Sequence, residues 1–218
     1  MRWNEFSDWG AKISQWAADY HTNLRDRPVR AQTAPGDVAA LIAPSAPEGP
    51  HPMTEIMKDF ERVVMPGITH WQHPRFFAYF PANAAPPSML AEMLVSTIAA
   101  QCMLWQTSPA ATEMETVMLD WLRQAIGLPA QFSGVIQDSA SSATLAAVLT
   151  MRERALNWQG NQAGLSGAVR LRIYCSAEVH TSVDRAIWVS GVGQDNLVRI
   201  PIAGKLRGMD PVALKAAI

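Results

Sequence analysis

The sequence contains little cysteine, no excess of either charge and no long apolar run. Its two cysteines, Cys102 and Cys175, lie in unrelated apolar segments, which argues against a disulfide framework and predicts buried free thiols in a reducing compartment. The net charge of −1 at pH 7 provides no basic surface for nucleic acid or for an anionic membrane. No apolar run approaches the roughly 20 residues of a membrane helix, and the amino terminus lacks the pattern of a signal peptide. We therefore expect a cytoplasmic protein.

Aromatic residues are unusually abundant, with eight tryptophans in 218 residues. Across residues 3–20, aromatic and aliphatic side chains recur every three to four positions, which predicts one apolar face of a helix. That face either packs on the core of a small domain or covers a second subunit, because so much aromatic surface needs a partner. Six prolines between residues 26 and 52 then predict an extended, wrapping connection with one short helix near residues 37–42.

Helical patterns give way to an alternating pattern in the second half of the chain. The first helices are predicted over residues 54–64, 88–103 and 109–127. Further on, predicted strands over residues 134–137, 169–175 and 196–201 alternate with predicted helices over residues 141–158 and 181–189. A last helix is predicted to start at Asp210 and Pro211. Such alternation predicts an α/β fold with a parallel sheet. Because a parallel sheet of three strands leaves an edge strand with unpaired backbone groups, the sheet is expected to be incomplete.

A cluster of small hydroxyl residues separates the first predicted strand from its helix. Ser139, Ser141 and Ser142 lie where free backbone N–H groups meet the positive end of the helix dipole, an arrangement that suits a phosphate. The same residues are equally typical of a plain helix cap. The G-x-S-x-G and P-loop patterns are missing from the sequence, which argues against a serine nucleophile and a nucleotide site of that type.

Histidines provide a second set of candidates. His180 follows the second predicted strand, and ligands bind outside the carboxyl ends of parallel strands; the alternative is a hydrogen-bonded structural imidazole. His70 and His73 are three residues apart, but Pro74 follows and neither a cysteine nor a second acidic partner lies nearby, so we expect no metal site. The aromatic run over residues 71–80 either lines an apolar pocket or is plain core.

Four segments together resemble the group II pyridoxal-phosphate-dependent amino-acid decarboxylases, in particular the aromatic-L-amino-acid decarboxylase branch. They read HWQHPRFFAYFPANAAPPSMLAEML, LWQTSPAATEMETVMLDWL, GVIQDSASSATL and YCSAEVHTSVDRA. The resemblance extends over the whole chain. It implies a helical amino-terminal dimerisation segment over residues 1–85. Residues 86–218 would then form the first half of a large, aspartate-aminotransferase-like α/β domain of fold type I, incomplete in this chain.

The resemblance also implies roles for individual residues. Ala140 and Ser141 fall where the family binds the phosphate of pyridoxal 5'-phosphate. His180 falls where the family stacks an imidazole on the pyridine ring, near the reacting carbon. The positions that correspond to the substrate pocket are Trp71, Tyr79, Phe80, Pro81, Gln101 and Met103. Family members are homodimers, and Gln101 and Met103 fall where the neighbouring subunit reaches into the pocket.

The implied activity is decarboxylation of an aromatic L-amino acid to its amine and CO2. The family attaches its cofactor to a lysine that follows a histidine, and none of the four lysines does so: Lys12, Lys58, Lys205 and Lys215. We therefore expect the activity to require a downstream segment, in the same chain or in a separate carboxy-terminal fragment. Two alternatives stay open. One is an aldehyde-forming enzyme of the same family, and the other is a non-catalytic dimerisation module.

Overall fold

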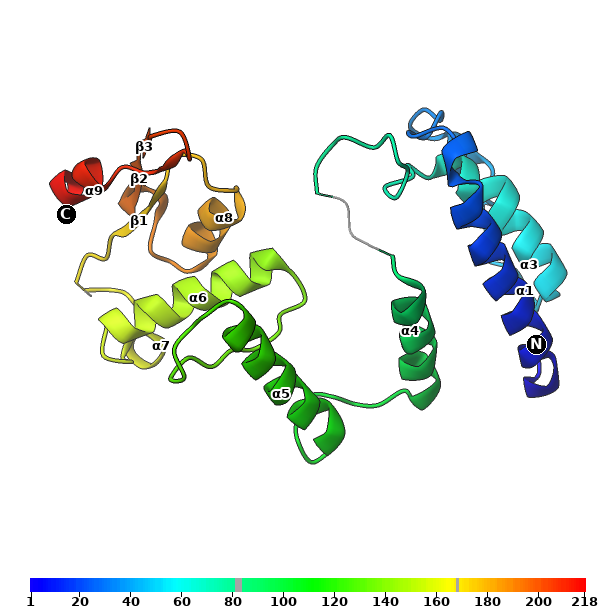
Figure 1. The fold of residues 1–218 in the computed structure, drawn as a ribbon, viewed down its shortest axis with the longest axis horizontal. Helices are drawn as coiled ribbons and strands as arrows, with labels where there is room; N and C mark the ends of the chain where they lie inside the picture. Colours follow the sequence, from blue (N-terminus) through cyan, green and yellow to red (C-terminus); the bar gives the residue numbers. More distant parts are fainter. Residues whose placement is uncertain (81–83, 168) are drawn as a thin grey trace. The chain divides into compact units, whose positions relative to one another are not determined.

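The computed structural model describes residues 1–80, 84–167 and 169–218, and the chain divides into two compact units (Figure 1). Unit 1 is Met1–Ala99 and unit 2 is Ala100–Ile218. This division by contacts does not test where functional domains begin, so the boundary between residues 85 and 86 stays a prediction. Among the helices of the described ranges, none is long and apolar enough to cross a membrane.

Unit 1 is helical. The predicted aromatic helix is confirmed as α1 (Trp3–Thr22), and its Trp16 ring packs edge-on against Phe60, with 5.2 Å between ring centroids. The proline-rich connection carries the short helix α2 (Asp37–Ala40), as predicted. The remaining elements are a 3-10 turn (Leu24–Asp26), α3 (Met53–Asp59) with its π-helical continuation (Phe60–Val64), a second 3-10 turn (Met65–Gly67), and α4 (Pro86–Ile98).

Helix α4 ends earlier than the sequence predicts. Ala99 takes a left-handed backbone conformation with φ of 50°, and its N–H donates to the carbonyl of Val95. A residue in that conformation ends an α-helix, so the predicted extension to residue 103 is wrong. Cys102 consequently lies beyond the helix and is exposed, which corrects the expectation of a buried thiol, whereas Cys175 is buried as expected.

Unit 2 contains the predicted β–α–β arrangement. Strands β1 (Ile173–Ser176) and β2 (Leu197–Ile200) pair in parallel, and α8 (Ser182–Val189) connects them. This pairing confirms the predicted parallel sheet for these two strands. The other elements are α5 (Pro109–Ala125), α6 (Ala140–Ala155), α7 (Gly160–Ala163), the antiparallel pair β3 (Ile202–Ala203) and β4 (Gly208–Met209), and α9 (Pro211–Ala217). Helix α9 begins as predicted, because the Asp210 carboxylate accepts the N–H groups of Val212 and Ala213.

The predicted strand over residues 134–137 does not form. The N–H of Ile136 donates instead to the Glu115 carboxylate of α5, at 2.7 Å, and the Ile136 side chain is exposed. A strand exists only where a neighbour accepts its ladder of hydrogen bonds, and the strands within the described ranges pair with one another elsewhere. The predicted strand is therefore wrong for the described residues, because they provide no neighbouring strand to pair with this apolar segment.

Helix α6 packs against α8 through the core of unit 2 (Figure 1). This core is small and apolar, and its buried members are Val148, Ala186, Ile187 and Val192. Leu145 and Val183, nearer the amino-terminal ends of the two helices, pack against it. The contact buries the apolar stripe of α8 and one side of α6, which favours the folded state by roughly 1.5–3 kcal/mol for each large side chain that is fully buried.

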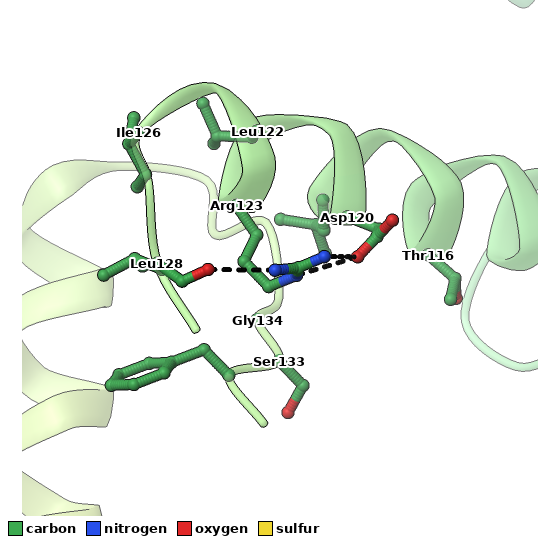
Figure 2. A pocket seen from close by; sticks show the side chains of 10 residues that line it. Thr116, Asp120, Leu122, Arg123, Ile126, Leu128, Ser133 and Gly134 are labelled. Atoms are coloured by element: carbon green, nitrogen blue, oxygen red, sulfur yellow. Dashed lines mark hydrogen bonds and ion pairs between the residues drawn. The ribbon is translucent and has the colours of Figure 1, made fainter. Parts of the chain in front are cut away.

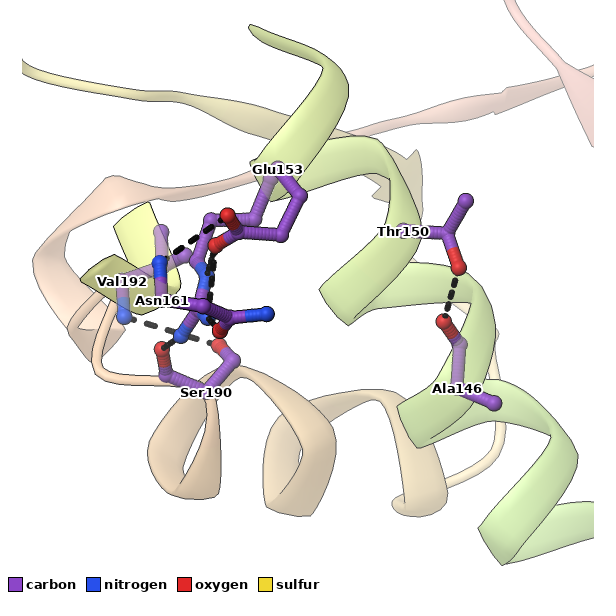
Figure 3. Close-up of polar contacts among 7 residues, drawn as sticks. Ala146, Thr150, Glu153, Asn161, Ser190 and Val192 are labelled. Atoms are coloured by element: carbon purple, nitrogen blue, oxygen red, sulfur yellow. Dashed lines mark hydrogen bonds and ion pairs between the residues drawn. The ribbon is translucent and has the colours of Figure 1, made fainter. Parts of the chain in front are cut away.

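A polar network joins the carboxyl-terminal ends of α6 and α8 (Figure 3). Arg152 donates to the carbonyl of Ser190 at 2.6 Å and to the side-chain oxygen of Asn161 at 2.8 Å. It also pairs with Glu153, whose other carboxylate oxygen accepts the N–H of Asn161 at 3.0 Å. Gly160 lies so close to this carboxylate that a Cβ atom would collide with it. Because the network ties the carboxyl-terminal ends together, the amino-terminal ends of both helices lie at the opposite end of the contact.

Several helices of both units expose apolar faces. Helices α1, α4 and α5 contain no buried residue within the described part of the chain. Large exposed side chains on α4 and α5 are Leu90, Leu94, Ile98, Met114, Trp121 and Leu122. Exposed apolar side chains in such number are typical of a surface that binds a partner or a ligand.

The Arg152 network generates a prediction about stability. Arg152→Ala leaves the buried Glu153 carboxylate without its cation, and it should lower the free energy of unfolding by about 3 kcal/mol. The matched control is Arg154→Ala, an exposed position two residues along the same helix, which should change it by less than about 0.5 kcal/mol. Urea unfolding followed by circular dichroism measures both. Equal effects of the two substitutions would contradict the assigned role.

Candidate phosphate cradle and aromatic loop

The amino terminus of α6 presents two free backbone donors. An α-helix leaves its first N–H groups without intrahelical partners. Here the Ser139 side chain accepts the N–H of Ser142 at 3.2 Å, and its carbonyl accepts the N–H of Ala143 at 3.0 Å. The two groups that lie between, the N–H groups of Ala140 and Ser141, belong to exposed residues at the positive end of the helix dipole. Ser139 is thus the helix cap, and the two N–H groups after it, here called the α6 cradle, are the donors that a phosphate would need.

His180 lies between β1 and α8, beyond the carboxyl end of a parallel strand. Its Nδ1 accepts the backbone N–H of Ser182 at 3.1 Å, and its carbonyl accepts the N–H of Val183 at 3.1 Å. Because a backbone N–H is always the donor, Nδ1 carries no proton and the ring proton is on Nε2. The ring itself is exposed. His180 therefore combines a structural contact through Nδ1 with a free Nε2–H group.

Trp71 is the centre of an aromatic stack in unit 1. Its ring lies 5.0 Å from Phe76 and 5.6 Å from Tyr79, between centroids, with interplanar angles of 29° and 21°. Tyr79 has a left-handed backbone with φ of 54°, which costs an aromatic residue about 1–3 kcal/mol. Trp71 as a whole residue is 44% exposed.

The remaining sequence-predicted pocket positions are less defined. Phe80 is almost fully exposed, at 97%, and Pro81 lies outside the described residues. Gln101 and Met103 are exposed in the irregular segment after α4. The structure thus brings Trp71 against Tyr79, and it places the α6 cradle and His180 before the amino-terminal ends of two packed helices. A binding role stays a prediction for every one of these residues, including Trp71, Tyr79, His180 and the two residues of the cradle.

His70 and His73 lie in the core of unit 1, each with 3% of its surface exposed. The Nδ1 atom of His70 lies 2.8 Å from the Tyr20 hydroxyl, and Nε2 of His73 lies 3.2 Å from the carbonyl of Arg25. These contacts use the ring nitrogens for protein hydrogen bonds. Groups of three or more metal-binding side chains do not occur among the residues whose placement is described. Sequence spacing singled out the two histidines but gave no sign of their partners, which come from α1 and the turn after it.

A separate pocket of about 430 Å3 lies at the carboxyl-terminal end of α5 (Figure 2). Arg123 crosses it, donating to the Asp120 carboxylate at 2.8 Å and to the carbonyl of Leu128 at 2.9 Å. Hydrogen bonds from Arg123 and Gln124 lower the pKa of the Asp120 carboxyl. The polar groups satisfy one another, and none of the sequence-predicted site residues lines this pocket. Its geometry therefore gives no reason to place the active site there.

Comparisons with known proteins agree with this geometry. The family model for the pyridoxal-dependent decarboxylase conserved domain matches residues 35–218. An aromatic-L-amino-acid decarboxylase of Sus scrofa is 40% identical, over 100% of this chain and 46% of that protein. Among solved structures, the tryptophan decarboxylase of Catharanthus roseus, in complex with L-tryptophan, is 32% identical with a TM-score of 0.90, over 100% of this chain and 46% of that one. The 4-hydroxyphenylacetaldehyde synthase of Rhodiola rosea is 30% identical with a TM-score of 0.90, over 100% and 47%.

These likenesses confirm the predicted fold class. Chains of fold type I match the described structure over its whole length, so the present residues form part of such a fold. The chain spans less than half the length of the curated relatives that it matches. A sheet with one parallel pair and an unformed edge strand is consistent with that extent.

The buried histidine of unit 1 generates a prediction about pH. Burial above all, and then the charges of Arg27 and His73, lower the pKa of His70 below its ordinary value. As the pH falls, His70 therefore takes up its proton in the unfolded chain before it does so in the folded chain. Its titration leaves the free energy of unfolding unchanged at pH 7.5 and lowers that free energy as the pH drops below about 6.5. The urea midpoint should decrease between pH 7 and pH 5.5.

The matched variant for this prediction is His70→Asn, which keeps a hydrogen-bonding side chain but does not titrate. Its urea midpoint should change less over the same interval than that of the unsubstituted chain. An identical pH dependence in both proteins would exclude His70 as the titrating group.

Proposed function

The chain belongs to the pyridoxal-dependent decarboxylase family, and on this premise we propose that it forms part of an enzyme that decarboxylates an aromatic L-amino acid. The proposed products are the corresponding amine and CO2, and the proposed cofactor is pyridoxal 5'-phosphate. The observation that carries the proposal is the pair of free N–H groups at the start of α6, in a chain whose relatives are named for this activity.

The residues at the start of α6 fit the phosphate of the cofactor. Two adjacent N–H donors and the dipole of a 16-residue helix favour a dianion, and Ser139 already caps the donor that follows. Ala140 and Ser141 have small side chains, so their backbone is accessible to a bulky phosphate. We assign these two residues to phosphate binding.

His180 is the residue of this chain that we assign to the reacting end of the cofactor. Pyridoxal phosphate, when bound, accepts the electron pair that stays on the substrate carbon as CO2 departs. The protein must orient the substrate and keep water from the reacting bond. His180 has a ring fixed through Nδ1 and a proton on Nε2, so it can pack on a flat ligand and hold a proton at that atom.

The aromatic stack of unit 1 supports an aromatic substrate. Trp71 and Tyr79 present large, flat apolar surfaces, and such surfaces pack on a phenyl or indole ring with offset or edge-on geometry. We assign Trp71, Tyr79, Phe80 and Pro81 to the substrate side chain, together with Gln101 and Met103 from a neighbouring subunit.

Exposed apolar surface supports a homodimer and a downstream segment. Helices α1 and α4 enclose an open groove of about 740 Å3 whose lining is mostly apolar, including Trp9, Ile13, Met89 and Met93. We propose that a second subunit covers this part of unit 1, and that a segment beyond residue 218 completes the sheet of unit 2 and supplies the cofactor lysine. The cytoplasmic location also stays a prediction, based on the two free thiols.

The likeness to the aldehyde synthase of Rhodiola rosea supports one second candidate, a decarboxylase that also removes the amine oxidatively. The test is to supply the assembled protein with cofactor and with tryptophan, tyrosine or phenylalanine. Amine with stoichiometric CO2 is the expected result. Aldehyde with hydrogen peroxide would establish the second candidate, and no CO2 from any aromatic amino acid would overturn both.

The α6 cradle generates the first prediction about function. Ser141→Asp places a carboxylate against the phosphate and should weaken cofactor affinity on the order of a hundredfold. Ser141→Ala is the control, because it removes the hydroxyl but keeps the backbone N–H, and its affinity should stay within about threefold of the unsubstituted protein. Absorbance titration with the cofactor measures both. A large loss of cofactor affinity in Ser141→Ala would contradict phosphate binding by the backbone N–H of this residue and would indicate that its hydroxyl binds the phosphate instead.

His180 generates the second prediction. His180→Asn keeps an oxygen acceptor for the N–H of Ser182 but removes the ring, so it should retain the fold and the cofactor while kcat falls by about 10²–10⁴-fold. His180→Ala should lose turnover equally and, in addition, some thermal stability. Steady-state kinetics and thermal melts separate these effects. Normal turnover in His180→Asn would mean that the imidazole serves only to cap α8.

A further inference from the structure

Three polar side chains of unit 1 take part in the hydrogen bonds that link the aromatic loop to α1 and to the turn after it. They are Tyr20 of α1 and the buried residues His70 and His73, which flank Trp71 on either side along the chain. The Nδ1 atom of His73 accepts the N–H of Arg75 at 3.0 Å, so its proton is on Nε2, which donates to the carbonyl of Arg25. The hydroxyl of Tyr20 and Nδ1 of His70 form a hydrogen bond of 2.8 Å.

The loop backbone is attached to the same wrapping segment. The N–H of His70 donates to the carbonyl of Val29 at 2.9 Å, and the N–H of Ala31 donates to the Thr69 hydroxyl at 3.2 Å. Pro28 stiffens this segment by fixing its φ angle. The loop is therefore held at its side chains and at its backbone by residues that lie about 40–50 positions earlier in the sequence.

Such a buried polar cluster is a costly way to provide stability alone. Two imidazoles and a phenol lose hydration on burial, and apolar residues of similar size fill a core without that loss. A hydrogen-bonded polar network instead favours one geometry, because each hydrogen bond is directional. The residue that this geometry fixes is Trp71, between the two histidines, with its ring stacked on Phe76 and Tyr79.

We propose that Tyr20, His70 and His73 are positioning residues that hold the Trp71 indole in one orientation for the aromatic substrate. They do not contact the substrate; they act through Trp71. The substrate side of this statement rests on the proposed function, whereas the orientation of Trp71 does not.

The test uses Tyr20→Phe, which removes one hydroxyl and keeps the ring that stacks on Trp16. The protein is labelled with 5-fluorotryptophan, and the 19F resonance of Trp71 is assigned with Trp71→Phe. The unsubstituted protein should give one sharp Trp71 resonance, which Tyr20→Phe should shift and broaden or split. His70→Asn, whose side-chain amide can pair with the Tyr20 hydroxyl as donor or as acceptor, should keep it sharp. If Tyr20→Phe does not fold, His73→Leu takes its place, because it removes the hydrogen bond from His73 to the carbonyl of Arg25. It should likewise shift and broaden or split the Trp71 resonance.

The control is Val63→Ala, which removes two methyl groups from a buried side chain of the same unit that takes no part in the cluster's hydrogen bonds. It should lower thermal stability and leave the Trp71 resonance unchanged. An unchanged Trp71 resonance in Tyr20→Phe, or an equal change in Val63→Ala, would overturn the proposal.

Kinetics of the assembled enzyme test the substrate side. Tyr20→Phe should raise KM for the preferred aromatic amino acid about tenfold, with kcat within about twofold and cofactor affinity unchanged. Val63→Ala should leave KM unchanged. A mobile Trp71 together with a normal KM would overturn the substrate role of the cluster. If the unsubstituted enzyme decarboxylates no aromatic amino acid, the proposed function fails, and the 19F result still decides whether the cluster orients Trp71.

Discussion

The packing of α6 against α8 is the contact on which the chemistry of unit 2 depends. An apolar core between the helices keeps them together, and the Arg152 network at their carboxyl-terminal ends fixes which ends meet. Since α8 is the crossover between two parallel strands, the same contact ties the start of α6 to the carboxyl edge of the sheet. The position of the α6 cradle relative to the loop that carries His180 is therefore set by one packing arrangement.

The sequence predicted what is local and missed what depends on distant partners. The α1 stripe, the capped start of α9 and the β–α–β alternation follow from spacing and end signals, and the structure contains them. The strand over residues 134–137 had the right apolar pattern but finds no neighbour in the described ranges, so it does not form. Glu153, in a charged Arg-Glu-Arg run, would pass for a solvated residue. Glu153 is buried where its carboxylate accepts the N–H of Asn161, and the spacing of apolar residues in the sequence does not predict that contact.

The candidate site divides in the same way. The hydroxyl-rich start of α6 and the histidine after β1 were visible as motifs, because the roles proposed for them depend on a helix end and a strand end. The partners of His70 and His73 were not visible, since Tyr20 and Arg25 lie about 50 residues away and meet them only after folding. Across the described residues the chain buries the polar side chains of His70 and His73, while large apolar side chains such as Leu94 and Trp121 are exposed. That distribution is expected of a polypeptide that completes its fold against other segments.

The central claim is that these 218 residues bind and orient the cofactor of a decarboxylase whose attachment lysine lies outside them. The most direct measurement is borohydride reduction of the cofactor-loaded protein, followed by denaturing mass spectrometry and peptide mapping. The account predicts a phosphopyridoxyl adduct on a lysine outside residues 1–218. Peptides from these residues, which together account for 23.9 kDa, should carry no adduct. A stoichiometric adduct on one of the four lysines of this chain, Lys12, Lys58, Lys205 or Lys215, would contradict it.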